Sequence, residues 1–369
     1  MRIVVAPQEF KGTLTAAHAA EAIAKGVRRA VPEATIDQAP LSDGGPGLVD
    51  AVLASRPGRR VRSRVQDPLG RPLRACWALL DEGTAVIEMA AAAGLVLLPE
   101  AERDPRITST YGVGQLIGEA VSSGARRIVV GVGGSATNDG GAGMAAALGA
   151  RLLDADGNEL PPGGAALIQL ARIDISGLDA RLHGMEVIAA TDVRNPLCGP
   201  EGASAVYGPQ KGASPDVVRE LDSALEHYSR VLARDLGVHV RDLPGAGAAG
   251  GLGSGLIAFL GADVRSGFDI VAEVTSLRER LRNADLLVTG EGRLDRQTAY
   301  GKTVARAAAM AREEGVPTLV VAGSLGDGWE EVRSLVDGVE VAGDGGPSEA
   351  VAAAAERGVT AWAGSIAGP

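Results

Sequence analysis

Residues 285–322 read DLLVTGEGRLDRQTAYGKTVARAAAMAREEGVPTLVVA. Two short apolar runs, DLLVT at 285–289 and TLVVA at 318–322, predict buried strands, and the segment between them predicts a helix beginning near Gly301. A strand, a helix and a second strand in this order form a parallel βαβ unit. A further strand at 339–342 and a last helix continue this pattern.

The beginning of the chain has the same pattern. We predict a strand at 2–7, a helix from Thr15 to about Arg29, and a second strand around 35–39. The Thr15 hydroxyl can accept a hydrogen bond from the first helical amides. The two chain ends therefore predict one doubly wound parallel domain.

The middle of the chain has a different pattern. Residues 61–88 contain stretches that alternate between apolar and polar side chains, which predicts half-exposed strands, whereas 126–132 and 186–191 resemble buried ones. A chain of 369 residues also exceeds the roughly 250–300 residues at which a single core stops growing. We predict an α/β fold with one domain of residues 1–60 plus 285–369 and an inserted mixed α/β domain of residues 61–284. Division into two contiguous halves is the alternative.

Composition excludes several classes of function. A net charge of −10 disfavours nucleic acid or an anionic membrane surface as the main partner, because phosphate backbones bind clustered Lys and Arg. No stretch reaches the ~20 apolar residues of a membrane span, and the N-terminal apolar run is too short for a secretory signal. With only two cysteines, Cys76 and Cys198, we expect no disulfide framework and a cytoplasmic location.

Five glycine-rich polar clusters follow predicted strands or precede predicted helices, where α/β proteins bind ligands. They are residues 6–13, 41–45, 131–143, 191–197 with 207–212, and 289–298. The third offers the strongest signal, with backbone amides at Gly133 and Gly134 and hydroxyls at Ser135 and Thr137 for an anion. Asn138 and Asp139 in the same loop could hold a cation.

The other clusters carry charged candidates. Lys11 in the first and Lys211 in the fourth could contact phosphate, and Asp192 could act as a general base or a Mg²⁺ ligand. Asp43 stands beside two glycines, which is more typical of a turn than of a metal site. The fifth cluster crowds two acids and two arginines into one loop, and a salt-bridged surface turn is its alternative interpretation.

Two familiar motifs match only in part. Residues 245–250 read GAGAAG, but the preceding RDLP is no strand, so the dinucleotide fingerprint is not supported there. A nicotinamide-dependent dehydrogenase would carry that fingerprint after the first strand, where residues 7–10 read PQEF. The GKT at 301–303 lacks the first glycine of a phosphate-binding P-loop, because Arg296 stands in its place. The four histidines lie outside every cluster, which disfavours hydrolase and zinc chemistry.

Taken in order, the clusters resemble the bacterial glycerate kinase family. The matching stretches are FKG at 10–12, DGG at 43–45, GGSATNDGGAG at 133–143, DVRNPL at 192–197, GPQKGA at 208–213, GAGAAGGLG at 245–253 and TGEGRLDRQT at 289–298 with the following GKT. The resemblance implies phosphorylation of D-glycerate by ATP with Mg²⁺, giving 2-phosphoglycerate or 3-phosphoglycerate. It also implies a Rossmann- or flavodoxin-like domain joined to a second α/β domain, with the active site in the cleft between them.

Phosphoryl transfer requires positioning and charge neutralisation more than covalent chemistry, so we assign hypothetical roles on that basis. Lys11 and Arg293 would neutralise anionic charge, and Asp192 would orient or deprotonate the attacking hydroxyl. The expected metal ligands are Asp43, Asp139 and Glu291. Substrate or phosphate contacts are expected from Gly133, Gly134, Ser135, Thr137, Asn138, Asn195, Lys211 and Asp295. The expected partners are glycerate and ATP, and the protein would be a homodimer or a monomer.

The chain departs from the family pattern at two motifs. Family members commonly read APDSFKGS and LADGGEGT, whereas this chain carries Gln8 and Glu9 in the first motif and Pro46 and Leu48 in the second. Two carboxylates are therefore absent, at Gln8 and Pro46. A kinase of another small hydroxy acid and a catalytically impaired ligand-binding relative are the alternative functions.

Overall fold

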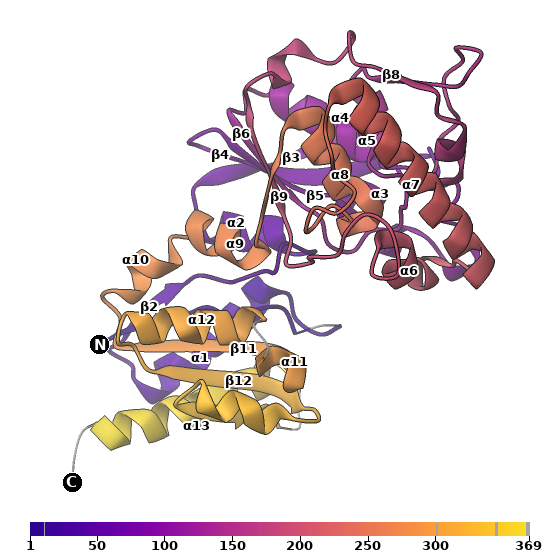
Figure 1. Cartoon of the computed structure of the whole chain (residues 1–369). Coiled ribbons are helices and arrows are strands. Elements are labelled where there is room, and N and C mark those ends of the chain that lie inside the picture. Colours follow the sequence, from indigo (N-terminus) through magenta and orange to yellow (C-terminus); the bar gives the residue numbers. More distant parts are fainter. Residues whose placement is uncertain (11, 300–301, 344–345, 367–369) are drawn as a thin grey trace. The chain divides into compact units, whose positions relative to one another are not determined.

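The computed structural model describes residues 1–10, 12–299, 302–343 and 346–366, and the chain divides into two compact units (Figure 1). Unit 1 comprises Met1–Asp43, Asp50–Arg56 and Phe268–Pro369, and unit 2 comprises Gly44–Val49 and Pro57–Gly267. Both ends of the chain thus belong to unit 1, which begins again at Phe268, upstream of the boundary expected at residue 285.

Unit 1 contains a five-stranded parallel sheet in the order β13-β12-β11-β1-β2. The strands are β1 (Arg2–Val5), β2 (Thr35–Gln38), β11 (Leu286–Leu294), β12 (Thr318–Leu325) and β13 (Gly338–Val341). Ile3 of β1 pairs with Leu286 of β11, so the first and the last thirds of the chain meet at the centre of this sheet.

Helices cover both faces of the unit 1 sheet. On one face, α1 (Ala16–Ala30) and α13 (Pro347–Ile366) pack against β1 and β11, and on the other, α12 (Thr303–Glu313) packs against β12. The Thr15 side chain accepts a hydrogen bond from His18 N at 3.2 Å, which confirms the predicted start of α1. The shorter helices of this unit are α9 (Gly267–Val274), α10 (Leu277–Leu281), α11 (Arg296–Ala299) and the 3₁₀ turn η6 (Trp329–Ser334), and α2 (Leu48–Ser55) runs from unit 2 into unit 1.

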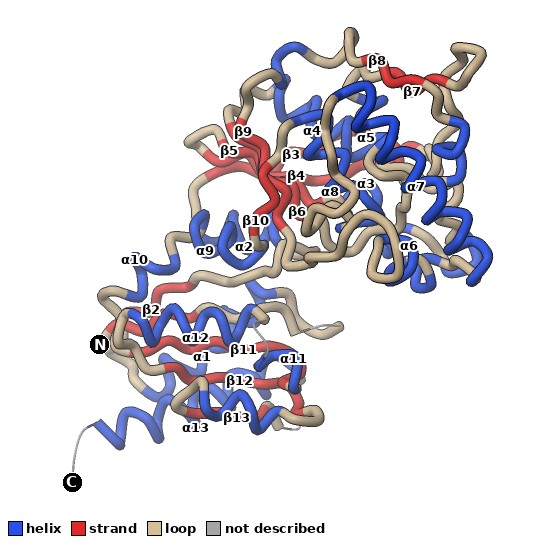
Figure 2. Tube along the Cα trace, viewed as in Figure 1, coloured by secondary structure: helices blue, strands red, loops and turns tan. Residues whose placement is uncertain are grey.

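Unit 2 is built on a six-stranded mixed sheet in the order β10-β9-β6-β5-β4-β3, shown as strands in Figure 2. These strands are β3 (Gly58–Gln66), β4 (Pro72–Leu80), β5 (Thr84–Glu88), β6 (Arg127–Gly131), β9 (Glu186–Ala190) and β10 (Asp263–Arg265). Strands β5, β6, β9 and β10 are parallel, and β4 and β3 extend the sheet as an antiparallel hairpin. A small pair, β7 (Arg151–Leu153) and β8 (Arg172–Asp174), stands apart from this sheet.

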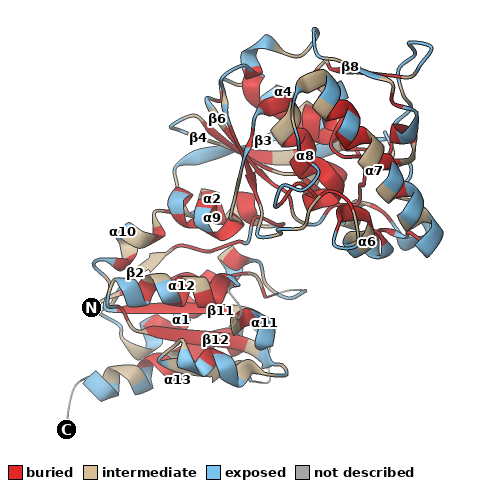
Figure 3. Cartoon of the chain, in the orientation of Figure 1, coloured by how far each residue is buried: buried red, intermediate tan, exposed pale blue. Residues whose placement is uncertain are grey.

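The helices of unit 2 bury apolar faces against this sheet and against one another (Figure 3). They are α3 (Ala90–Ala93), α4 (Tyr111–Ser122), α5 (Ala142–Ala147), α6 (Ala203–Tyr207), α7 (Pro215–Leu236) and α8 (Ala248–Leu260). The 3₁₀ turns are η1 (Leu95–Leu97), η2 (Glu100–Glu102), η3 (Ala165–Gln169), η4 (Ala180–Leu182) and η5 (Pro209–Lys211). None of the helices in the described parts of the chain is long and apolar enough to cross a membrane.

The observed architecture confirms the predicted α/β fold class, with a parallel sheet built from both chain ends and a second, mixed sheet. One element differs from the prediction. Strand β11 continues beyond Thr289 to Leu294, because Glu291 and Arg293 pair with Ala322 and Ser324 of β12. The fifth glycine-rich cluster therefore begins as sheet, not as a loop.

Candidate functional site

In unit 2, two glycine-rich clusters follow neighbouring parallel strands. Residues 132–141 leave the end of β6, and residues 191–197 leave the end of β9, which pairs with β6 from Val187 to Ala190. Carboxyl ends of adjacent parallel strands lie along the same edge of a sheet. The third and fourth clusters therefore share that edge of unit 2, as the sequence predicts.

Glycines permit close backbone contacts where the loop after β6 begins. A Cβ atom at Gly131 would overlap with Gly44 O, and one at Gly133 would lie 2.6 Å from the Cα of Gly45. Gly44 and Gly45 directly follow Asp43 in the sequence. The glycines of the second and third clusters are thus needed for packing against one another.

Three side chains from distant parts of unit 2 hold the middle of this loop, residues 136–138. Thr108 Oγ1 donates to Ala136 O at 2.9 Å, and Lys211 Nζ donates to Thr137 O at 2.7 Å. The Asn138 amide donates from Nδ2 to Ser204 Oγ at 2.9 Å. Backbone hydrogen bonds also hold this loop, because Leu95 N donates to Gly134 O and Ala136 N donates to Ala93 O, each at 2.9 Å.

Asp139 is fully buried and accepts four hydrogen bonds. Its Oδ2 accepts from Thr110 N at 2.8 Å, from Thr110 Oγ1 at 2.9 Å and from Gly143 N at 3.2 Å, while Oδ1 accepts from Gly141 N at 3.2 Å. Burial raises the pKa of this carboxyl, and the four donors lower it in part. This environment is typical of a carboxylate that organises backbone amides, and the metal ligand expected at Asp139 stays a prediction.

Lys211 is also buried, with only 1% of its surface exposed. Desolvation lowers the pKa of its ammonium group to about 7, although the nearby charge of Asp139 acts in the opposite direction. Its hydrogen bond to Thr137 O directs the amine into the protein. The expected phosphate contact at Lys211 thus has the environment of an internal anchor for the loop.

The accessible part of the loop is short. Gly134 is exposed, Gly133 is half-buried and Ser135 is 8% exposed, whereas Thr137 and Asn138 are completely buried. Within the described structure, Thr137 Oγ1 and Asn138 Oδ1 have no hydrogen-bond partner. Among the candidate residues of this loop, Gly133, Gly134 and Ser135 are therefore the ones that a ligand from solvent can reach.

The loop after β9 presents an exposed carboxylate. Asp192 Oδ1 accepts a hydrogen bond from Ser266 Oγ at 2.6 Å, and Ser266 follows the neighbouring strand β10. Asn195 has a different role, because its Nδ2 donates to Glu201 O at 2.7 Å and its Oδ1 accepts from Tyr207 at 2.8 Å. Asp192 is thus available from solvent, while Asn195 ties together the loop that carries it.

In unit 1, the first, second and fifth clusters follow adjacent strands. Gln8 N donates to Gly290 O at 2.8 Å, which joins the loop after β1 to the end of β11. Leu41 N donates to Pro7 O at 2.8 Å, so the segment that leads to Asp43 runs along the same loop. These contacts bring three clusters to the carboxyl edge of the unit 1 sheet. Lys11, the charged candidate of the first cluster, lies outside the described residues.

The end of β11 carries a compact polar group. Glu291 Oε1 accepts a hydrogen bond from Thr298 Oγ1 at 2.6 Å, and Asp295 Oδ1 accepts from Gln297 N at 2.9 Å at the start of α11. Arg293 is exposed, and a Cβ atom at Gly326 would lie 2.6 Å from its Nε. Glu291 is thus held by Thr298 of the short helix α11, and Arg293 lies beside Gly326, which follows β12.

The carboxylates suit a cation that is held mainly by phosphate oxygens. No group of three or more His, Cys, Asp or Glu side chains that could hold a metal ion occurs in the parts of the chain that the structure describes. Mg²⁺ commonly binds through one or two carboxylates together with substrate phosphates and water. Glu291 and Asp43 provide oxygen ligands of this kind, and the donor set is compatible with Mg²⁺.

Sequence reasoning missed the partners that hold the candidate residues in place. Thr108, Thr110, Ser266 and Thr298 each donate a hydrogen bond to a candidate residue or to the loop after β6, and Ser204 accepts one from Asn138. Only Thr108 and Thr110 carry a local signal, because a Ser/Thr-rich stretch before an apolar periodic segment marks the start of a helix. The others are separated in sequence from their partners.

Known proteins with similar sequences support one family. The glycerate kinase family model matches residues 3–368. A glycerate kinase from Bacillus subtilis is 50% identical over 326 residues, covering 88% of this chain and 85% of that protein. A glycerate 2-kinase from Escherichia coli is 49% identical over 328 residues, covering 89% of this chain and 86% of that protein.

Structural similarity agrees with this assignment. The crystal structure of a candidate glycerate kinase 2 from Salmonella typhimurium LT2 matches with a TM-score of 0.91 and 44% sequence identity. The match covers all of this chain and 99% of the other. With the family model spanning nearly every residue and both glycine-rich edges in place, the chain belongs to the glycerate kinase family.

Proposed function

We propose that this protein transfers the γ-phosphoryl group of ATP to the 2-hydroxyl of D-glycerate and forms 2-phosphoglycerate. The observation that carries the proposal is the loop after β6. Thr108 and Lys211 hold its backbone by hydrogen bonds to Ala136 O and Thr137 O, while Gly133–Ser135 remain accessible. A rigid set of amides can bind an anion without reorganisation during the reaction. The 49% identity to a glycerate 2-kinase supports the choice of the 2-hydroxyl.

Asp192 is the proposed base that orients or deprotonates the attacking hydroxyl. It is exposed at the end of β9, and the hydrogen bond from Ser266 fixes one of its oxygens. The Asp192 carboxylate would receive the hydroxyl proton of glycerate. Phosphoryl transfer depends mainly on such alignment, since little covalent chemistry is required of the protein.

The charged groups of unit 1 would neutralise the phosphates. Arg293, exposed at the end of β11, and Lys11 would contact phosphate oxygens. Asp43 and Glu291 would hold Mg²⁺, directly or through water, and Thr298 keeps Glu291 in a fixed orientation. Bound Mg²⁺ would neutralise charge on the β- and γ-phosphates during transfer.

Four candidate residues take supporting roles in this proposal. Lys211 and Asp139 would shape the loop from within the core, because both are buried and both bond to it. Asn195 would hold the loop that carries Asp192. Asp295 would fix the start of α11 and so support Glu291.

The test is a phosphoryl-transfer assay with purified protein, ATP, Mg²⁺ and D-glycerate, in which phosphorus NMR identifies the phosphorylated oxygen. We expect 2-phosphoglycerate, and Asp192→Asn should reduce kcat by about 10²–10⁴-fold, the usual contribution of a general base. 3-Phosphoglycerate as the product would contradict the assigned hydroxyl. A turnover that appears only with another hydroxy acid would contradict the assigned substrate and would direct attention to Gln8 and Pro46.

A further inference from the structure

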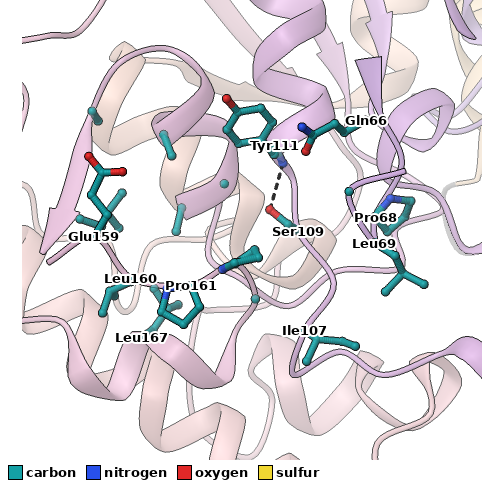
Figure 4. A pocket seen from close by; sticks show the side chains of 18 of the residues that line it. Gln66, Pro68, Leu69, Ile107, Ser109, Tyr111, Glu159, Leu160, Pro161 and Leu167 are labelled. Atoms are coloured by element: carbon teal, nitrogen blue, oxygen red, sulfur yellow. Dashed lines mark hydrogen bonds between the residues drawn. The ribbon is translucent and has the colours of Figure 1, made fainter. Parts of the chain in front are cut away.

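Unit 2 contains a cavity of about 620 Å³ that none of the proposed catalytic groups lines (Figure 4). Its walls come from the turn between β3 and β4, the start of α4, helix α5, strand β7 and the loop that follows β7. Glycerate has only three carbon and four oxygen atoms. A cavity of this size is therefore suited to a considerably larger ligand. Ligand pockets of roughly 300–1,000 Å³ usually bind drug-sized molecules.

The chemistry of the lining favours a neutral, flat ligand. Pro68 and Leu69 lie on one side of the cavity in Figure 4, and Leu160, Pro161 and Leu167 lie on another. These apolar side chains can cover the faces of a ring system. They offer no charge to attract a carboxylate or a phosphate.

The two charged residues of the lining neutralise each other. Arg151 Nε forms an ion pair with Glu159 Oε1 at 3.1 Å. The remaining polar side chains include Gln66 and Tyr111, which lie next to each other in Figure 4 and offer hydrogen-bond donors and acceptors. An apolar cavity with a few neutral polar groups is a suitable environment for a nucleobase and its ribose.

Hydrogen bonds connect the surroundings of the cavity to the loop after β6. Gly143 lines the cavity, and its amide donates to Asp139 Oδ2 at 3.2 Å. Thr108 stands between the lining residues Ile107 and Ser109, and its hydroxyl donates to Ala136 O at 2.9 Å. A ligand in the cavity would thus lie next to residues that hold the loop carrying Gly133–Ser135.

We propose that this cavity binds the adenosine part of ATP, while the phosphates extend toward Gly133–Ser135. The inference rests on the proposed kinase function, because that reaction requires a site for a nucleoside next to an anion-binding loop. The lining supplies the uncharged surface that adenosine needs, and the loop supplies the amides that phosphates need.

The decisive variant is Ala146→Phe, which fills the cavity from an exposed position on α5. Ala180→Phe is the matched control, since Ala180 is also exposed but does not line the cavity. We expect the ADP dissociation constant of Ala146→Phe, measured by titration calorimetry, to rise by about tenfold or more, which corresponds to ~1.4 kcal/mol. The KM for ATP should rise in parallel, while the KM for D-glycerate and all constants of Ala180→Phe should stay at the wild-type values.

Photolabelling of the wild-type protein with 2-azido-ADP provides a second measurement that does not depend on a variant. Labelled peptides that contain residues 66–70 or 142–163 would support the inference, and labelling confined to other peptides would overturn it. Wild-type ADP affinity in Ala146→Phe, or equal weakening in both variants, would also overturn it. If the cavity is labelled but no phosphoglycerate forms, the proposed function fails while the nucleotide site stands.

Discussion

The carboxyl edges of the two sheets carry polar loops that are built in opposite ways. After β6 in unit 2, Asp139 and Lys211 are buried, and their hydrogen bonds reach the backbone of the loop itself. At the end of β11 in unit 1, Glu291 and Asp295 stay partly exposed, and each bonds to a residue only a few positions away. Polar residues at the same topological position can therefore serve as internal scaffold in one sheet and as accessible groups in the other.

The largest stability effect is expected at Gly250, which touches the loop after β6 from α8. Its φ of +69° is left-handed, and a Cβ atom there would overlap with Thr137 O. We expect Gly250→Ala to lower the free energy of unfolding by about 3 kcal/mol or more, from strain and overpacking together. Urea denaturation provides the measurement.

The control for this variant is Gly124→Ala in the same unit. Gly124 has a φ of +87° but nothing within 4 Å of a Cβ position, so only the conformational strain of about 1–2 kcal/mol should remain. Equal destabilisation by the two variants would show that the loop tolerates a closer neighbour than its packing indicates.

The same substitution in both loops tests the comparison directly. Asp139→Asn replaces an acceptor of four hydrogen bonds in the core and leaves Lys211 without its nearby negative charge, so we expect about 2 kcal/mol of destabilisation. Asp295→Asn should change stability by less than about 0.5 kcal/mol, because Asn caps a helix start as well as Asp does. Thermal and urea unfolding of the two variants provide the measurement. A larger loss of unfolding free energy in Asp295→Asn than in Asp139→Asn would contradict the comparison.

The pH dependence of stability should reveal the buried amine. Burial lowers the pKa of Lys211 to about 7 from an ordinary value of 10.5, so between these values the unfolded chain binds a proton that the folded protein does not. The free energy of unfolding should therefore rise with pH across this window, by up to about 1.4 kcal/mol per pH unit. Below about pH 7 the amine is charged in both states, and the full penalty of burying it is present.

Lys211→Met keeps most of the side-chain volume and should remove this rise. Its unfolding free energy, measured in urea at pH 7.0 and pH 8.5, should increase less than that of the wild type by about 1 kcal/mol or more. A surface lysine, Lys302, serves as the matched control, and Lys302→Met should keep the wild-type slope. Identical slopes in Lys211→Met and the wild type would mean that the amine titrates normally in the folded state.

A small effect on stability is expected from Thr298→Val in unit 1. This variant removes the hydrogen bond to Glu291 Oε1 and should lower the free energy of unfolding by only about 0.5–1 kcal/mol. Because Glu291 is proposed to hold Mg²⁺, the variant should need a higher Mg²⁺ concentration for half-maximal activity. An unchanged Mg²⁺ concentration for half-maximal activity would contradict the proposed role of Glu291 as a Mg²⁺ ligand.

Much of the fold was predictable because both chain ends carry short β-branched strands alternating with helical segments. The extension of β11 to Leu294 was not, since Gly290 and Gly292 are typical of a loop. Its pairing with β12 depends on tertiary contacts, and Gly290 allows the close approach to Val321. Local pattern therefore identified the strand but not its end.

The position of the candidate site was predictable for a similar reason, because strand ends are visible in the sequence. The burial of Asp139 and Lys211 was not, since the same residue types serve as ligands and as internal anchors. Their environment depends on Thr110 and Thr137, which lie 29 and 74 residues from their respective partners. No local signal reports such distant contacts.

The pairing of Ile3 with Leu286 also has a consequence for the order of events during synthesis. At the usual ~5–20 residues per second, the ribosome needs roughly 15–60 s to make the chain between these two strands. All of unit 2, Gly44–Val49 and Pro57–Gly267, precedes β11 in the chain and can fold within that time. Strand β1 must meanwhile keep one edge unpaired, which makes the earliest part of the nascent chain a target for chaperones and one of the last parts to fold.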